Sequence, residues 1–306
     1  DMRTDGWELS VGWRDHIGDW GYRLNLNVYD HKSKITKFNN LSGSIDNYYV
    51  GKALNSIYGY RADGYYSIDD FDMEKAKVGT WVLKEGVVSV SGYSVQPGDV
   101  KFKDLDGNGV IDAGGSTLEN PGDREIIGNS TSRYQFGGNL GVSWKGLDLN
   151  VLLQGVGKRD YWLGGAALFP FGAAGADGVF WPLYYNQTDY WSAVSYDPQS
   201  PDYMVAKNPD AKLFRVYGQD GNAGSNARVS DKYIQNAAYL RVKNVTLSYS
   251  FPSSLLRKVA LDQLRLYVSV ENLATFTSLP KGYDPESLSW SYPFYRTWSV
   301  GASITF

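Results

Sequence analysis

The last stretch of the chain, residues 294–306, alternates apolar and polar side chains with a period of two. Such alternation is typical of a β-strand with one apolar and one polar face. Aromatic residues stand at both ends of the apolar face and small aliphatic residues between them, as a bilayer-crossing strand requires. A soluble sandwich also alternates, but this distribution favours an outer-membrane barrel. The apolar positions, interrupted by Arg296, are Phe294, Trp298, Val300, Ala302, Ile304 and Phe306.

The same alternation recurs earlier in the chain, so that the sequence predicts about seven antiparallel strands in an all-β fold. Within residues 238–251 the apolar positions shift from even numbers (Leu240, Val242) to odd numbers (Val245, Leu247). A one-residue slip turns every later side chain to the other face, so we expect a β-bulge near Lys243 and Asn244. The earlier stretches are residues 7–14, 22–29, 134–144, 147–154, 238–251 and 264–271.

Tight and long connections alternate between these strands. Tight turns are expected near Gly18, Gly146 and Pro252, with one helical turn capped by Ser253 at the third, whereas residues 38–133 and 157–236 form long segments. The tight turns therefore share one side of the sheet. If the C-terminus is periplasmic, the two long segments are extracellular loops.

Composition narrows the class of protein. Aromatic residues make up 15% of the chain and there are 34 glycines, which favours strands and turns. The net charge of −3 argues against a nucleic-acid partner, and the absence of cysteine excludes disulfides and thiolate metal sites. No nucleophile elbow, P-loop or HExxH motif occurs, so we expect no enzyme. A single-chain bacterial barrel needs at least about eight strands, so seven are an arc of a larger barrel.

Several strings occur in an order that resembles the C-terminal portion of the SusC/RagA family of TonB-dependent outer-membrane transporters. The resemblance covers nearly the whole chain. The strings are GDVKFKDLDGNGVID, DREIIGNSTSRYQFGGNLGVSWKGLDLNVLLQGVGKRDYW, NAAYLRVKNVTLSYSFP, LRLYVSVENLATFT, KGYDPE and YRTWSVGASITF.

The resemblance implies a barrel of about 22 strands with a plugged lumen, energised through a TonB box. It also implies a SusD-like surface lipoprotein and the outer membrane of a Gram-negative, Bacteroidota-type bacterium. Neither plug nor TonB box lies in these residues, and no signal peptide opens them, so we expect a piece of a longer mature protein. The implied function is import of a nutrient, with oligosaccharide the family's usual cargo. The alternatives are a peptide importer of the same family and a secreted carbohydrate-binding β protein with a dockerin-like calcium loop.

Residues 104–112 match the first nine positions of an EF-hand-type calcium loop. Oxygen ligands would come from side chains at positions 1, 3, 5 and 9 and from a backbone carbonyl at position 7. Position 12 should be a glutamate but is Gly115, so Asp123 or Glu119 would have to complete the site. The alternative is a turn that binds no metal. The candidate ligands are Asp104, Asp106, Asn108, Val110, Asp112 and Asp123, for a structural Ca²⁺.

The second long segment concentrates aromatic residues among glycine, aspartate and asparagine. Exposed rings can stack on sugars or anchor a protein partner, whereas rings that fold inward only stabilise the loop. We expect most of them to be buried. Trp162, Trp181 and Trp191 are the residues expected to contact ligand or partner.

Overall fold

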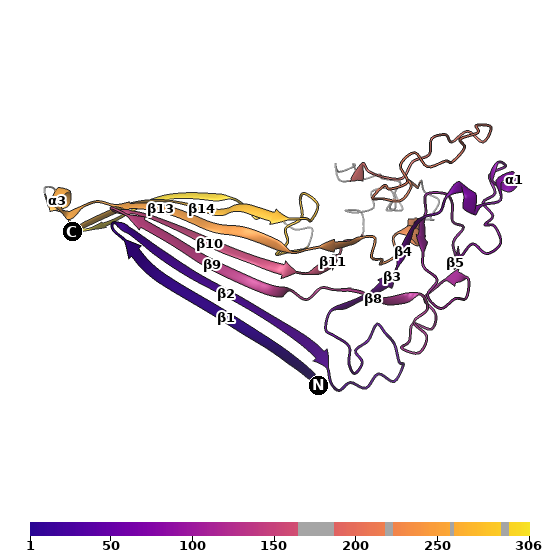
Figure 1. Ribbon diagram of the computed structural model, residues 1–306, viewed down its shortest axis with the longest axis horizontal. Coiled ribbons are helices and arrows are strands. Elements are labelled where there is room, and N and C mark those ends of the chain that lie inside the picture. Colours follow the sequence, from indigo (N-terminus) through magenta and orange to yellow (C-terminus); the bar gives the residue numbers. More distant parts are fainter. Residues whose placement is uncertain (165–186, 218–222, 258–259, 289–293) are drawn as a thin grey trace. The chain divides into compact units, whose positions relative to one another are not determined.

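The structure, a computed structural model, describes residues 1–164, 187–217, 223–257, 260–288 and 294–306. It divides into two compact units (Figure 1). Unit 1 comprises Asp1–Met2, Lys34–Ser130 and Tyr161–Gln235, and unit 2 comprises Arg3–Ser33, Thr131–Asp160 and Asn236–Phe306. Among the described residues, no helix is long and apolar enough to cross a membrane.

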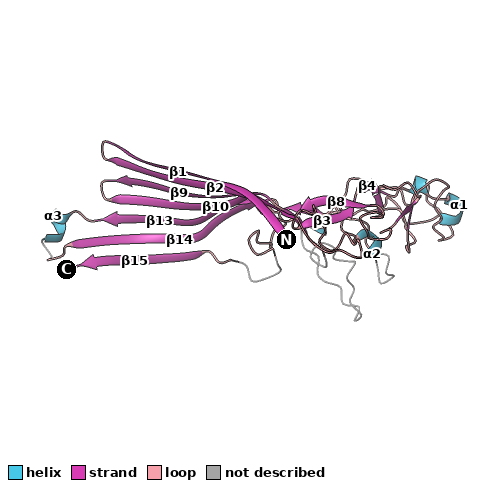
Figure 2. Cartoon of the chain, turned by 90° about the horizontal axis from the view of Figure 1, so that it is seen from below, coloured by secondary structure: helices cyan, strands magenta, loops and turns pink. Residues whose placement is uncertain are grey.

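Unit 2 is built on one antiparallel sheet of seven strands that lie side by side in chain order (Figure 2). The all-β prediction and the seven strands are confirmed. A single helical turn, α3 (Ser253–Leu256), joins the fifth and sixth strands. The strands are β1 (Met2–Ile17), β2 (Trp20–Ile35), β9 (Arg133–Trp144), β10 (Leu147–Lys158), β13 (Tyr239–Ser250), β14 (Gln263–Thr277) and β15 (Thr297–Thr305).

The register places the tight turns at one end of this sheet. Trp144 lies opposite Trp20 on one side and opposite Leu147 on the other, so the turns that follow β1 and β9 are neighbours. Thr305 lies opposite Gln263, which brings the end of the chain to the same side. The helical turn there begins after Pro252, which is its N-cap, so the expectation that Ser253 caps it is wrong.

The pairing joins the apolar positions into continuous rows across six strands. One row contains Tyr22, Val142, Leu149, Leu247, Val268 and Val300, and the next contains Leu24, Leu140, Val151, Val245, Val270 and Trp298. Much of this face is uncovered in the chain: Val300 is 81% exposed and Phe306 86%. At the turn end, Trp20 stacks on Trp144 with ring centroids 5.4 Å apart. Aromatic rings therefore border an uncovered aliphatic surface.

The predicted bulge is confirmed at Lys243. Leu152 lies opposite Asn244 and Leu153 opposite Val242, so Lys243 is the extra residue. The bulge keeps Val242 and Val245 on one face although they are three residues apart. On the neighbouring β14 the register also shifts, and Asn272 there has a left-handed backbone with φ of 51°.

Unit 1 contains short strands and turns around its own apolar core. Its strand pairs are β3 (Ser56–Tyr60) with β8 (Arg124–Asn129), β4 (Ala62–Tyr65) with β6 (Val100–Phe102), and β5 (Ser89–Val90) with β7 (Val110–Ile111). A further pair is β11 (Asp160–Trp162) with β12 (Ile234–Asn236), and the helical turns are η1 (Ile68–Asp70), α1 (Met73–Ala76) and α2 (Ala223–Asn226). The two long segments of the sequence are thus folded segments that share a core.

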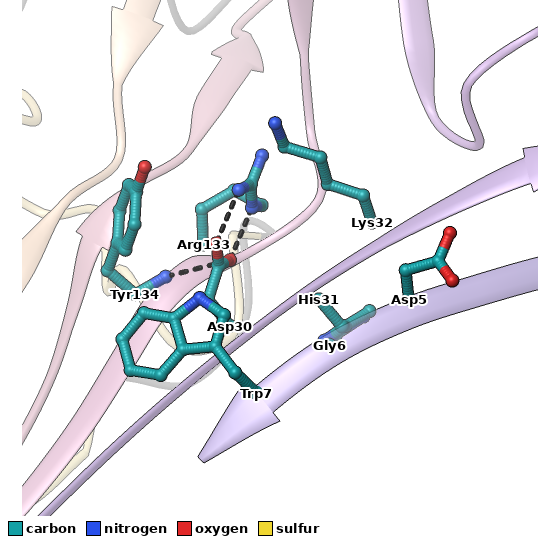
Figure 3. A pocket seen from close by; sticks show the side chains of 8 residues that line it. All are labelled: Asp5, Gly6, Trp7, Asp30, His31, Lys32, Arg133 and Tyr134. Carbon is teal, nitrogen blue, oxygen red and sulfur yellow. Dashed lines mark hydrogen bonds and ion pairs between the residues drawn. The ribbon is translucent and has the colours of Figure 1, made fainter. Parts of the chain in front are cut away.

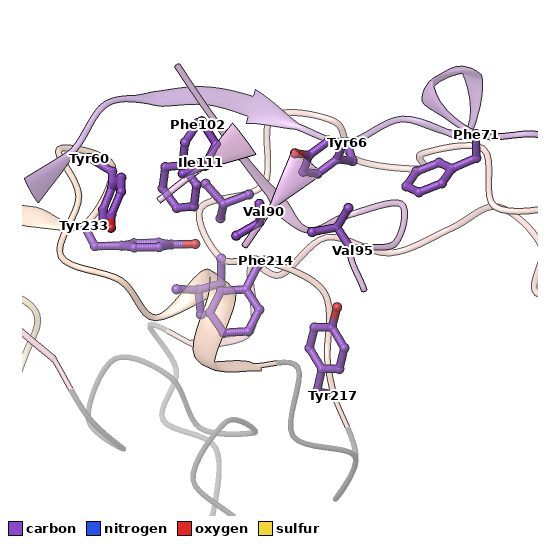
Figure 4. Close-up of a cluster of buried hydrophobic side chains, with 12 residues drawn as sticks. Tyr60, Tyr66, Phe71, Val90, Val95, Phe102, Ile111, Phe214, Tyr217 and Tyr233 are labelled. Carbon is purple, nitrogen blue, oxygen red and sulfur yellow. The ribbon is translucent and has the colours of Figure 1, made fainter. Parts of the chain in front are cut away.

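The core of unit 1 is rich in aromatic side chains (Figure 4). Tyr66 and Phe71 are fully buried, with ring centroids 6.1 Å apart. The turn between them begins where Ser67 donates its backbone N–H to the Asp70 carboxylate at 2.8 Å, as part of a capping box. Buried rings supply most of the apolar area that holds such a unit together.

Candidate functional site

Two features of the chain carry polar chemistry, one in each unit. The polar face of the seven-stranded sheet belongs to unit 2, and a loop of aspartates belongs to unit 1. Each is described by itself.

The polar face of the sheet carries rows as continuous as those of the apolar face. One row contains Arg23, Gly141, Asn150, Thr246, Ser269 and Ser299. Arg23 donates to the Asp148 carboxylate at 2.7 Å and to the Asn150 side chain at 3.3 Å. A Cβ on Gly141 would lie 2.7 Å from Arg23 Nε, so the glycine lets the arginine reach across β9 to β10.

Arg241 is the most deeply buried charge on this face, because its side chain is 0% exposed. It forms ion pairs with Asp284 and with Glu286, the latter at 3.1 Å, and Lys243 contacts Glu286 at 3.0 Å. Arg241 Nε also donates to the Thr275 hydroxyl at 2.9 Å. Two cations of β13 thus face two carboxylates from the segment that follows β14, and the segment is held against the sheet.

The aspartate loop brings three carboxylates together. One oxygen from each of Asp104, Asp106 and Asp123 lies within 4.8 Å of the others. Asp123 is 0% exposed, and its two oxygens accept the N–H groups of Leu105 at 2.7 Å and Asp112 at 2.8 Å. Asp123 therefore joins the first aspartates from farther along the chain, as the incomplete loop pattern required.

Backbone contacts and burial shift these carboxylates in opposite directions. The N–H of Gly109, at 2.8 Å, leads the hydrogen bonds that lower the pKa of Asp104. Burial raises the pKa of Asp123, although the backbone donors oppose this. Asp104 is thus easily ionised, whereas ionisation of Asp123 beside it costs free energy because the carboxylate is buried.

Among the predicted aspartate ligands, Asp112 lies outside this group of three. The Asn108 side chain accepts the N–H of Val110 at 2.7 Å, and Asp112 Oδ1 accepts the N–H of Gly114 at 2.6 Å. These side chains stabilise turns. The structure therefore brings together three of the four predicted aspartate ligands.

The three predicted contact tryptophans have different outcomes. Trp191 is 2% exposed and packs on Gly98, where any Cβ would clash with its ring. The expectation that Trp191 contacts ligand or partner is corrected, because the ring belongs to a small core of unit 1. Trp162 is half-buried, with its ring 6.4 Å from that of Tyr233. Trp181 lies outside the described residues.

The Arg241 cluster was missed by sequence reasoning. Its partners Asp284 and Glu286 lie within the string KGYDPE, which was noted only for its resemblance. Arg241 and Asp284 are 43 residues apart. The sequence signal that could have revealed these ion pairs is the presence of two basic residues, Arg241 and Lys243, in an otherwise alternating strand.

Fold and polar face together define a segment of barrel wall, and comparisons with known proteins agree. No family model matches the chain. It is 27% identical over its whole length to TonB-dependent receptor P3 of Formosa agariphila and 23% identical over its whole length to TonB-dependent receptor SusC of Bacteroides thetaiotaomicron. It covers 29% and 26% of these proteins, so the chain spans less than a third of the length of the curated relatives it matches.

Solved structures show the same fold. The structure of the RagAB peptide transporter matches the whole chain with a TM-score of 0.63 at 19% identity, over 29% of its own chain. The RagAB peptide importer in its closed-closed state matches with a TM-score of 0.60 at 18% identity, over 30% of its own chain. The resemblance to SusC/RagA-type TonB-dependent transporters is confirmed, for a part of such a protein.

The Arg241 cluster yields a direct prediction for the segment that it holds. Arg241→Ala in the full-length protein leaves Asp284 without its cation, and loss of one partner of a buried pair costs of the order of 3–5 kcal/mol. We expect the segment to detach locally and trypsin to cleave faster after the exposed Lys281. The matched control is Arg23→Ala, which removes an ion pair of the same face that does not involve this segment. Equal cleavage in both variants would contradict the assignment.

Proposed function

We propose that the chain forms part of the wall of a TonB-dependent importer in a bacterial outer membrane. The observation that carries this proposal is the pairing of continuous apolar rows on one face with continuous polar rows on the other. In this arrangement the apolar face meets lipid and the polar face lines a hydrated lumen. The backbone groups are satisfied between strands, as a bilayer demands.

The orientation follows from the connections. The tight turns and the end of the chain share one end of the sheet, which we assign to the periplasm. Residues 38–133 and 157–236 then belong to the extracellular side. The complete barrel would have about 22 strands, of which this chain supplies seven.

The cargo we propose is an oligosaccharide, delivered with the help of a SusD-like surface lipoprotein. Similarity to SusC supports the lipoprotein partner. The oligosaccharide rests on the resemblance to the SusC/RagA family, for which it is the usual cargo. A peptide cargo is the second candidate, supported by the shared fold with the RagAB peptide transporter. Trp162 and Trp181 remain the proposed contacts to ligand or lipoprotein. The chain would bind and translocate without covalent chemistry. A secreted carbohydrate-binding protein would not leave rows of Trp and Val uncovered.

Uptake by whole cells tests the proposal. Cells with the full-length gene should accumulate a labelled oligosaccharide, and deletion of the gene or collapse of the proton-motive force should abolish accumulation. A labelled peptide is the matched control. If deletion of the gene abolishes only peptide uptake, the protein is an importer whose cargo is a peptide and not an oligosaccharide. Unchanged uptake of both, with the protein in the soluble fraction, would contradict the function.

We also propose that the aspartate loop binds a structural calcium ion. Asp104, Asp106 and Asp123 offer hard oxygen ligands within a small volume, which is the donor set that Ca²⁺ prefers. A cation there would offset the burial of the Asp123 charge and the repulsion between the three carboxylates. The ion would stiffen residues 104–123 without taking part in transport.

Removal of calcium should therefore loosen this loop. Chelation of the wild-type protein should increase protease cleavage within residues 95–130, while the barrel stays assembled. The double variant Asp104→Ala/Asp106→Ala should show the same cleavage with or without chelator. Glu119→Ala, which removes an exposed carboxylate outside the group of three, should respond like the wild type. Chelation that leaves cleavage of the wild type unchanged would exclude the metal.

A further inference from the structure

A cavity of about 390 Å³ lies in unit 2 near the ends of β1, β2 and β9 that are far from the tight turns (Figure 3). Its lining combines two aromatic rings, Trp7 and Tyr134, with charged side chains, among them Asp30, Lys32 and Arg133. Neither the import function nor the predicted sites of the sequence account for it.

The cavity lies at the border of the apolar face. On β1, Trp7 continues the alternating positions of Leu9 and Val11. On β2, the apolar series ends at Val28, opposite Phe136, and Asp30 and Lys32 take the next two positions of that face. The chemistry of the face therefore changes from aliphatic through aromatic to charged within a few residues, as at the edge of a bilayer.

The charges of the cavity are unequally compensated. Arg133 pairs with Asp30 through Nε and Nη2, and Asp30 also accepts the N–H of Tyr134 at 3.3 Å. Arg3 pairs with Asp5 at 2.9 Å. Lys32 is exposed and has no carboxylate partner within the described part of the chain. Of the lining side chains, Lys32 and Arg133 are basic and Asp5 and Asp30 are acidic. Asp5 is paired with Arg3 from outside the lining and Asp30 with Arg133, so Lys32 is the lining cation without an ion-pair partner among the described residues.

Arg133 adds a second free donor. A guanidinium has five N–H donors, and the contacts with Asp30 use those of Nε and Nη2. Nη1 has no acceptor within the described residues, and the guanidinium lies 5.2 Å from the centre of the Tyr134 ring. The pairing with Asp30 fixes the orientation of the guanidinium. Nη1 and the Lys32 ammonium are then both available to an anion.

We propose that this cavity binds the phosphorylated headgroup of a membrane lipid. The phosphate would contact Lys32 and Arg133 Nη1, and the rings of Trp7 and Tyr134 would flank it at the interface. The acyl chains would lie along the apolar face over Leu9, Val28 and Phe136. Basic residues beside a membrane attract anionic lipids in this way, and acyl chains need an apolar surface directly below the charge. The inference rests on the proposed membrane placement of the sheet.

The test uses the purified full-length protein in detergent, with defined lipids added and retained lipid counted by native mass spectrometry. Phosphatidylglycerol should be retained in preference to phosphatidylcholine. Lys32→Gln should lower this preference about fivefold, since one lysine near a membrane surface is worth about 1 kcal/mol. Lys32→Arg should keep the preference for phosphatidylglycerol, because the positive charge remains. Arg14→Gln is the matched control, since Arg14 lies on the polar face of the neighbouring strand β1.

Two results would overturn the site. Equal lipid preference in the wild type and Lys32→Gln would show that the cavity does not select the headgroup. Complete displacement of phosphatidylglycerol by inorganic phosphate would show that the cavity takes a free anion and not a lipid. Fractionation of the same proteins separates these results from failure of the proposed function, because a sheet that is not in the membrane leaves the wild type in the soluble fraction.

Discussion

The hydrogen-bonded pairing of seven neighbouring strands is the constraint on which the rest of the structure depends. Each strand presents alternate residues to the two faces, so the pairing decides which side chains meet lipid and which meet water. A slip of one residue would exchange the faces of a strand. The bulge at Lys243 satisfies this constraint, because it returns the apolar side chains in the second half of β13 to the same face as those of the neighbouring strands.

The polar face depends on the same register. Gly141 lies between Arg23 and Asn150, so the arginine can cross one strand and pair with the next. Lys243, the residue that forms the bulge, also contacts Glu286 at 3.0 Å. Lys243 thus has two roles. As the extra residue of the bulge it keeps the apolar side chains of β13 on one face, and as a cation it holds the segment after β14. In the proposed importer, this segment lies over the lumen side of the wall.

The sequence predicted what is periodic and missed what depends on tertiary contacts. Alternation located the seven strands and the bulge, because each strand face has a fixed period. Aspartate spacing located the loop at Asp104, whereas the turn contacts of Asn108 and Asp112 follow from local geometry. Trp191 looked exposed in a segment rich in glycine and aspartate, but Gly98 and a small core enclose it. The partners of Arg241 come from another connection, which no local pattern reveals.

The central claim is that one face of the sheet meets lipid and the other meets water. Nitroxide labels at Leu266, Tyr267, Val268 and Ser269 of β14, in the full-length protein in lipid vesicles, test it most directly. The account predicts that Leu266 and Val268 are accessible to oxygen, which dissolves in lipid, and that Tyr267 and Ser269 are accessible to a polar nickel complex. Equal accessibility along the strand, or the reverse alternation, would contradict the claim.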